Sequence, residues 1–120
     1  MTGGWALETA RTSVPAETIR GRTCLVLRIR PELIPDYVAD HQRVWPEMLE
    51  ALRRTGWRNY SLFLREQDGM VIGYFEADDV DAARDAMNDS EVNRRWQQSM
   101  ARYFVPGSRP EFLPLCFHLE

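Results

Sequence analysis

A predicted β-hairpin in the middle of the chain constrains the fold more than any other feature of the sequence. Residues 59–65 place apolar side chains at alternate positions, and residues 70–77 form a second run that is rich in apolar and aromatic residues. The four residues between these runs end in Asp68-Gly69, a pair that favours a tight turn between antiparallel strands. We therefore expect the other elements to assemble around an antiparallel sheet.

One strand and one helical region are predicted before this hairpin. Residues 24–30 begin as an apolar run, end in alternation and stop at Pro31. A helix then extends as far as Gly56, because apolar residues recur at helical spacing over about five turns. Pro46 lies inside this pattern and cannot donate an amide hydrogen bond to the carbonyl of Gln42, which predicts a kink or a break there.

A second helical region and a last strand are predicted after the hairpin. Residues 78–79 can cap this region, and residues 88–90 interrupt it before a new helix begins. A loop at 106–110 leads to a strand at 112–119. The order β-α-β-β-α-β is that of the ferredoxin-like α+β fold, in which an antiparallel sheet carries its helices on one face.

The second face of this sheet also needs cover. Apolar residues lie on both sides of the strands at 59–65 and 70–77, so we expect the sheet of a second copy to pack there, giving a homodimer. Residues 1–22 show no regular period and are expected to form an irregular N-terminal extension. Residues 23–120 are then a single domain.

Composition excludes several kinds of chemistry. All 15 basic residues are arginine, and the absence of lysine excludes Schiff-base catalysis, a phosphate-loop lysine and Ser-Lys nucleophiles. The two cysteines lie far apart in the sequence, and the two histidines show no metal-ligand spacing, so neither a metal site nor a cofactor is expected.

Charge and hydropathy bear on partners and location. A net charge of −3 gives no footprint for nucleic acid or an anionic membrane. No apolar run approaches the roughly 18 residues that span a bilayer, and the N-terminus lacks the pattern of a secretion signal. We expect a cytoplasmic protein that binds neither nucleic acid nor membranes.

Ring-bearing side chains form the candidate site. Tyr37, His41 and Trp45 are four residues apart and share one face of the predicted helix. The predicted topology places Tyr60 and Trp96 on the same side of the sheet. Hydroxyl and imidazole groups with indole faces suit a monosaccharide, whose hydroxyls need hydrogen bonds and whose C–H surface packs on rings. Spacing alone favours an ordinary helix core over a ligand site.

His41 is the candidate for proton transfer. An imidazole with the ordinary pKa of about 6.5 both gives and takes protons near neutral pH, which fits a reaction that needs only general acid–base catalysis. Trp45 and Met48, on either side of Pro46, are expected to support the site rather than contact the ligand. His118, near the C-terminus, is expected to be structural.

The same residues carry a family likeness. The pattern Tyr37-x-x-x-His41-x-x-x-Trp45-Pro46-Glu47, with Asn59-Tyr60, Arg95-Trp96 and a closing Phe117-His118-Leu119, resembles the L-rhamnose mutarotases over residues 24–120. The resemblance implies a dimeric α/β barrel of ferredoxin-like subunits that uses no cofactor and interconverts the α and β anomers of a 6-deoxy hexose.

The resemblance also implies roles for individual residues. His41 matches the proton donor of the family, Tyr37 and Tyr60 match its sugar-contacting tyrosines, and Trp96 matches the first residue of a tryptophan pair. The second tryptophan falls on Gln97 here, so an amide replaces an indole at one edge of the predicted sugar site. This departure bears on which sugar is bound more than on the reaction.

The implied mechanism leaves the base open. Ring opening needs one proton delivered to the ring oxygen and one removed from the anomeric hydroxyl; His41 is expected to supply the first. A water, Tyr60 or Glu76 could each accept the second. Two other functions share this architecture: a cofactor-independent monooxygenase of the dimeric α/β barrel type, and a sugar-binding module without catalysis.

Overall fold

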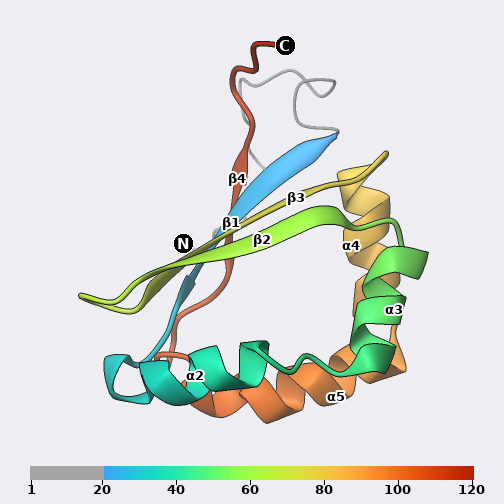
Figure 1. Cartoon of the computed structure of the whole chain (residues 1–120). Helices are drawn as coiled ribbons and strands as arrows, with labels where there is room; N and C mark the ends of the chain where they lie inside the picture. Colours follow the sequence, from blue (N-terminus) through green and yellow to red (C-terminus); the bar gives the residue numbers. More distant parts are fainter. Residues whose placement is uncertain (1–20) are drawn as a thin grey trace.

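The computed structural model describes residues 21–120, which form a four-stranded antiparallel sheet with its helices on one side (Figure 1). The strand order β2-β3-β1-β4 confirms the predicted ferredoxin-like α+β fold. The elements are β1 (Arg22–Arg28), η1 (Pro31–Leu33), α2 (Ile34–His41), α3 (Pro46–Arg54), β2 (Arg58–Arg65), β3 (Met70–Glu76), α4 (Val80–Asn88), α5 (Glu91–Met100), η2 (Ala101–Tyr103) and β4 (Glu111–Pro114). The expected extension at 1–22 lies outside the described residues except for its last two positions, and Arg22 already belongs to β1.

The predicted hairpin is present, and its turn depends on one glycine. Gly69 has a φ of +80°, and a Cβ at this position would lie 2.1 Å from the carbonyl oxygen of Ile29. Asp68 completes the turn, because its carboxylate accepts hydrogen bonds from the Arg65 side chain and from the Met70 amide. Only glycine fits both the backbone conformation and the close approach.

The predicted interruption at Pro46 is a complete break between two helices. α2 ends at His41 and α3 begins at Pro46, where a missing amide hydrogen removes no helical hydrogen bond. Trp45 precedes α3 in an extended conformation, with φ −55° and ψ 134°. The expectation that Trp45 shares a helical face with Tyr37 and His41 is therefore wrong.

The second helical region divides as predicted. The Asp79 side chain accepts a hydrogen bond from the Ala82 amide at 3.1 Å and caps α4. The chain then turns, and Ser90 caps α5 by accepting from the Asn93 amide at 3.3 Å. None of the helices in the described range 21–120 is long and apolar enough to cross a bilayer.

The last strand is shorter than predicted. β4 covers only Glu111–Pro114, and residues 115–120 have no regular secondary structure. β4 pairs with β1 alone, and the ladder ends with Thr23 opposite Pro114, because β1 begins only one residue earlier. The predicted strand at 112–119 is therefore wrong beyond Pro114, and Phe117 and Leu119 are 73% and 80% exposed.

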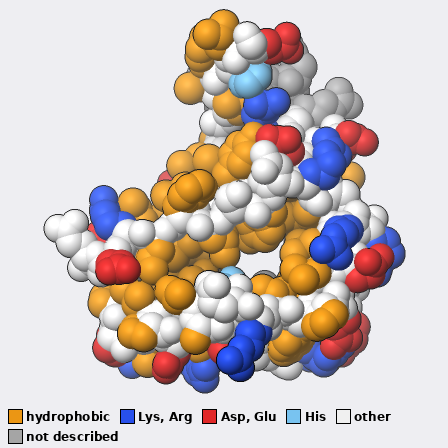
Figure 2. Space-filling model, in the orientation of Figure 1, with side chains coloured by type: hydrophobic (Ala, Val, Ile, Leu, Met, Phe, Trp, Pro, Cys, Tyr) orange, Lys and Arg blue, Asp and Glu red, His pale blue; other side chains and the backbone are white. Residues whose placement is uncertain are grey.

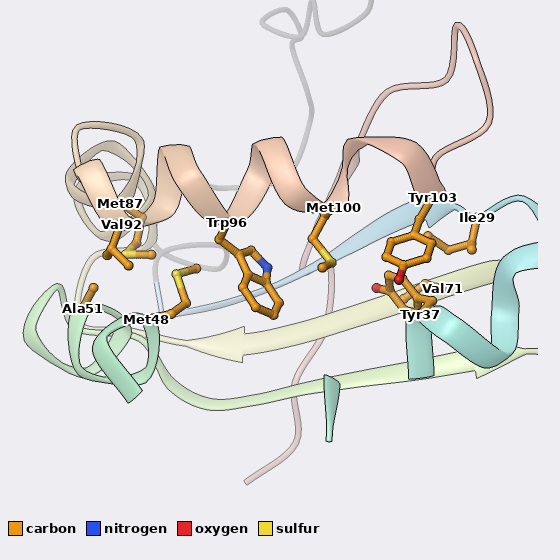
Figure 3. Packing of buried hydrophobic residues seen from close by; sticks show 10 residues of the cluster. All are labelled: Ile29, Tyr37, Met48, Ala51, Val71, Met87, Val92, Trp96, Met100 and Tyr103. Atoms are coloured by element: carbon orange, nitrogen blue, oxygen red, sulfur yellow. The ribbon is translucent and has the colours of Figure 1, made fainter. Parts of the chain in front are cut away.

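The core lies between the sheet and the helices. Its larger cluster joins α5, α3 and α2 to the inner sheet face, and Figure 3 shows Trp96 and Met48 from two of these helices together with Tyr37 beside Tyr103. A smaller cluster around Phe75 packs against α4. Gly73, in the middle of β3, lies between Leu25 and Leu62 of the neighbouring strands, and a Cβ there would meet both at 3.0–3.1 Å.

Candidate functional site

A large cavity lies between part of the inner sheet face and the helices. Its volume is about 1800 Å³, larger than the roughly 300–1,000 Å³ of ordinary ligand pockets, and Figure 2 shows it as an opening with a mainly hydrophobic surround. The five residues that the sequence singled out as catalytic or substrate-binding all line it: Tyr37, His41, Tyr60, Trp96 and Gln97. The fold therefore brings the candidate residues of two helices and one strand to one cavity.

The hydrogen bonding of His41 defines which nitrogen is available. His41 is the last residue of α2, and its Nδ1 lies 2.8 Å from the carbonyl oxygen of Tyr37. A carbonyl only accepts hydrogen bonds, so Nδ1 carries the hydrogen and Nε2 is left for a ligand. The imidazole also packs against the Tyr37 ring at 4.3 Å and edge-on to Trp96 at 5.6 Å, measured between centroids.

The two tyrosines present neutral hydroxyl groups to the cavity. Burial raises the pKa of Tyr37, and the nearby Tyr60 raises it further, because two phenolates would repel each other. Burial also raises the pKa of Tyr60 to about 12. Tyr60 is 39% exposed, and because it lines the cavity, the exposed part of its side chain includes the part that faces the cavity. Both side chains donate and accept hydrogen bonds near neutral pH, and Tyr60 is a poor choice for the base.

A local irregularity of β2 comes immediately before Tyr60. Asn59 has a φ of +51°, in the left-handed region, and the register with β3 shifts between Arg58 and Ser61. The Asn59 amide donates to the Glu76 carboxylate at 3.1 Å. Sequence patterns gave no sign of this bulge, although asparagine tolerates the left-handed conformation better than most residues.

Glu76 is not placed to act as the base. It follows Phe75, whose side chain lies in the core, so Glu76 lies on the opposite face of the sheet from the cavity. Its carboxylate accepts hydrogen bonds from Tyr74, at 2.6 Å, and from Asn59. Both hydrogen bonds lower the pKa of Glu76, and the bond from Tyr74 has the larger effect.

Trp96 forms the centre of the aromatic group. It is 7% exposed, and its ring meets that of Trp45 edge-on at 5.1 Å. Met48 is buried and lines the cavity, whereas Trp45 is not among the lining residues and packs behind Trp96. Gln97 is exposed at the cavity edge, where its amide donates to Asn93 at 3.1 Å. Asn93 also lines the cavity, and its sequence context gave no sign of this.

A further polar group behind the site was also missed. The Tyr103 hydroxyl donates to the Asp40 carboxylate at 2.5 Å, and Arg102 donates to the same oxygen at 3.4 Å. Asp40 immediately precedes His41, whereas Tyr103 is 63 residues away in the sequence. Within residues 21–120, no three His, Cys, Asp or Glu side chains are grouped so that they could hold a metal ion.

Comparison with known proteins identifies similar chains. A family model described as L-rhamnose mutarotase matches residues 22–118. The L-rhamnose mutarotase of Bacillus subtilis (strain 168) is 34% identical over 99 residues, which are 82% of this chain and 92% of that protein. The L-rhamnose mutarotase of Pectobacterium carotovorum (strain PC1) is 33% identical over the same shares of both chains.

Solved structures are similar in fold. The crystal structure of an L-rhamnose mutarotase from Formosa agariphila matches with a TM-score of 0.67 and 21% identity, covering 82% of this chain and 98% of that one. A monooxygenase of Streptomyces coelicolor in complex with nanaomycin D matches with a TM-score of 0.59 and 9% identity, covering 91% and 96%. At these identities the likeness concerns the fold alone.

Proposed function

This chain belongs to the L-rhamnose mutarotase family, and from that membership we propose that it interconverts the α and β anomers of L-rhamnose or a related 6-deoxy hexose. The observation that carries the proposal is the family match over residues 22–118. The site supports it, since a histidine, two neutral tyrosines and a buried tryptophan line one cavity.

His41 is proposed to transfer the proton in both directions through Nε2. With Nδ1 bonded to the Tyr37 carbonyl, neutral Nε2 accepts the proton of the anomeric hydroxyl and then delivers it to the ring oxygen. The C1–O5 bond breaks as the C1 carbonyl forms, the C1–C2 bond rotates, and the reverse steps close the ring on the other face. Both oxygens are bonded to C1, so one nitrogen reaches both and no separate base is needed.

The other lining residues are proposed to bind and orient the sugar. Tyr37 and Tyr60 stay protonated and hydrogen-bond to sugar hydroxyls, while Trp96 packs its ring against the C–H surface of the sugar. Gln97 and Asn93 supply amide groups at the edge of the cavity. These contacts hold C1 beside His41.

Anomer exchange followed by saturation-transfer NMR tests the proposed function. A panel should contain L-rhamnose, other 6-deoxy hexoses and the common hexoses, each compared with its uncatalysed exchange. We expect faster exchange for L-rhamnose or another 6-deoxy hexose. If no sugar exchanges faster than in buffer, the proposal is wrong; a ligand-dependent rise in melting temperature would then indicate a binding module, and oxygen uptake with a hydroquinone would indicate a monooxygenase.

The outer face of the sheet supports a homodimer as part of the proposal. Phe63, Ile72 and Val26 are neighbours across three strands on this face; Phe63 is 62% exposed, Ile72 is half-buried and Val26 is 9% exposed. A large aromatic side chain that stays exposed beside aliphatic neighbours on a sheet marks a surface for protein contact. A second copy of the chain would present the same row of residues.

Phe63→Glu is expected to weaken self-association roughly tenfold or more, because it places a carboxylate in a desolvated contact. Sedimentation of a dilution series measures the change. Val38→Glu, which changes an exposed apolar residue of α2 in the same way, is the control and should leave association unchanged. A wild-type chain that sediments as a monomer at all concentrations would contradict the proposed dimer.

A further inference from the structure

We infer that Asp40 and Tyr103 form a positioning pair that holds the His41 imidazole in the orientation and tautomer needed for proton transfer. The inference rests on the role proposed above for His41. Neither Asp40 nor Tyr103 is among the residues that line the cavity, so neither is expected to touch the sugar. Their effect passes through the last turn of α2 and through the ring of Tyr37.

Tyr103 is fixed by its surroundings. It lies in η2, directly after the helix that carries Trp96, and it is fully buried. Its carbonyl oxygen accepts a hydrogen bond from the Arg30 amide at 2.7 Å, and the neighbouring Phe104 bridges to Ile29. Burial, and then the bond to Asp40, raise the pKa of Tyr103, so its hydroxyl remains a donor. The hydroxyl is therefore a rigid point to which another element can be attached.

The last turn of α2 needs such an attachment. α2 has only eight residues and ends at His41, and a helix of this length is not stable by itself. A carboxylate in the last turn of a helix also faces the negative end of the helix dipole, which is unfavourable without a donor. Asp40 occupies that turn and accepts from Tyr103 at 2.5 Å and from Arg102 at 3.4 Å. These bonds hold the turn closed beside η2.

The pair also acts on the imidazole through Tyr37. The Tyr103 ring meets the Tyr37 ring edge-on at 5.6 Å, and the Tyr37 ring packs on His41 at 4.3 Å. The Tyr37 carbonyl in the same turn accepts the His41 Nδ1 hydrogen at 2.8 Å. If the turn opens, this bond lengthens, the preference for hydrogen on Nδ1 is lost, and Nε2 no longer faces the ligand as an acceptor.

Tyr103→Phe and Asp40→Asn test the inference with little change in shape. We expect each to lower kcat for anomer exchange about ten- to hundredfold, the range produced by a small misplacement of a catalytic group, with KM nearly unchanged. The nitrogen chemical shifts of the His41 ring should move from the Nδ1–H tautomer of the wild type toward a mixture. The chain has two histidines, so His118→Gln assigns the His41 signals. The double variant should lose no more activity than either single one, because the two residues act as a unit.

Tyr74→Phe is the matched control. It removes a tyrosine-to-carboxylate hydrogen bond of similar length, 2.6 Å to Glu76, on the face of the sheet away from the cavity. It should leave both kcat and the His41 shifts unchanged. If Tyr103→Phe lowers stability but moves neither kcat nor the His41 tautomer, the pair is merely structural and the inference is wrong. A lower kcat with an unmoved tautomer also overturns it. Because the tautomer is read without substrate, it tests the inference even if the proposed function fails.

Discussion

The His41→Gln variant is expected to lose about 10²- to 10⁴-fold in catalysed anomer exchange, the usual contribution of a positioned acid–base group. Glutamine keeps a polar side chain of similar reach, but its amide neither accepts nor releases a proton near neutral pH. The tyrosines and Trp96 remain, so the variant should still bind the sugar. The loss should therefore appear in kcat rather than in KM.

Saturation-transfer NMR measures this loss directly, after the uncatalysed exchange in buffer has been subtracted. His118→Gln makes the same chemical change at an exposed residue that hydrogen-bonds to Arg22, outside the cavity, and should exchange at the wild-type rate. If the His41 variant retains at least half of the wild-type rate, His41 does not transfer the proton.

Trp96→Ala is expected to have the largest effect on stability, lowering the free energy of unfolding by about 3–5 kcal/mol. Trp96 is 7% exposed and packs against His41 and Trp45. Its removal deletes the ring contact between α5 and Trp45, in the segment that joins α2 to α3, and it leaves a void next to the existing cavity. Trp96→Phe keeps a ring in place and should cost less than half as much.

Denaturant unfolding followed by circular dichroism gives both values. Gln97→Ala, at the next position of the same helix, is the control; an exposed side chain such as Gln97 should change stability by only about 0.5 kcal/mol. A loss below about 1 kcal/mol for Trp96→Ala would show that the neighbouring rings close over the gap and that Trp96 does not hold the site together.

The sequence predicted those features that local chemistry determines. The turn at Asp68-Gly69 depends on a positive φ that glycine adopts readily, and the caps at Asp79 and Ser90 depend on side chains that accept from nearby amides. The break before α3 follows from the missing amide hydrogen of Pro46. Each of these signals lies within a few residues of the feature that it specifies.

Features that depend on distant partners were missed or misjudged. The length of β4 is limited by where β1 begins, which no pattern in residues 112–119 records. Trp45 was wrongly placed on the helical face of Tyr37 and His41. The residues after His41 keep apolar side chains at helical spacing, although the chain there is not helical. The bond between Asp40 and Tyr103 joins residues 63 positions apart, and neither shows a local signal of the other.

The candidate site shows the same division. Spacing related Tyr37 to His41, and the order of the elements placed Tyr60 and Trp96 on the same side of the sheet; all four line one cavity. What sequence could not provide was the hydrogen bond from Nδ1 to the Tyr37 carbonyl, which decides the free nitrogen of His41. The sequence also did not predict that Glu76 lies on the face of the sheet away from the cavity.

The cavity lining has a consequence for the durability of the protein. In the proposed reaction each turnover passes through an open-chain aldehyde, and aldehydes condense with primary amines to form Schiff bases. The basic residues that line the cavity are the arginines Arg28, Arg84 and Arg109, and the chain contains no lysine. A guanidinium stays protonated and is a poor nucleophile near neutral pH. The aldehyde therefore meets no side-chain amine, and the site is protected from glycation by its own intermediate.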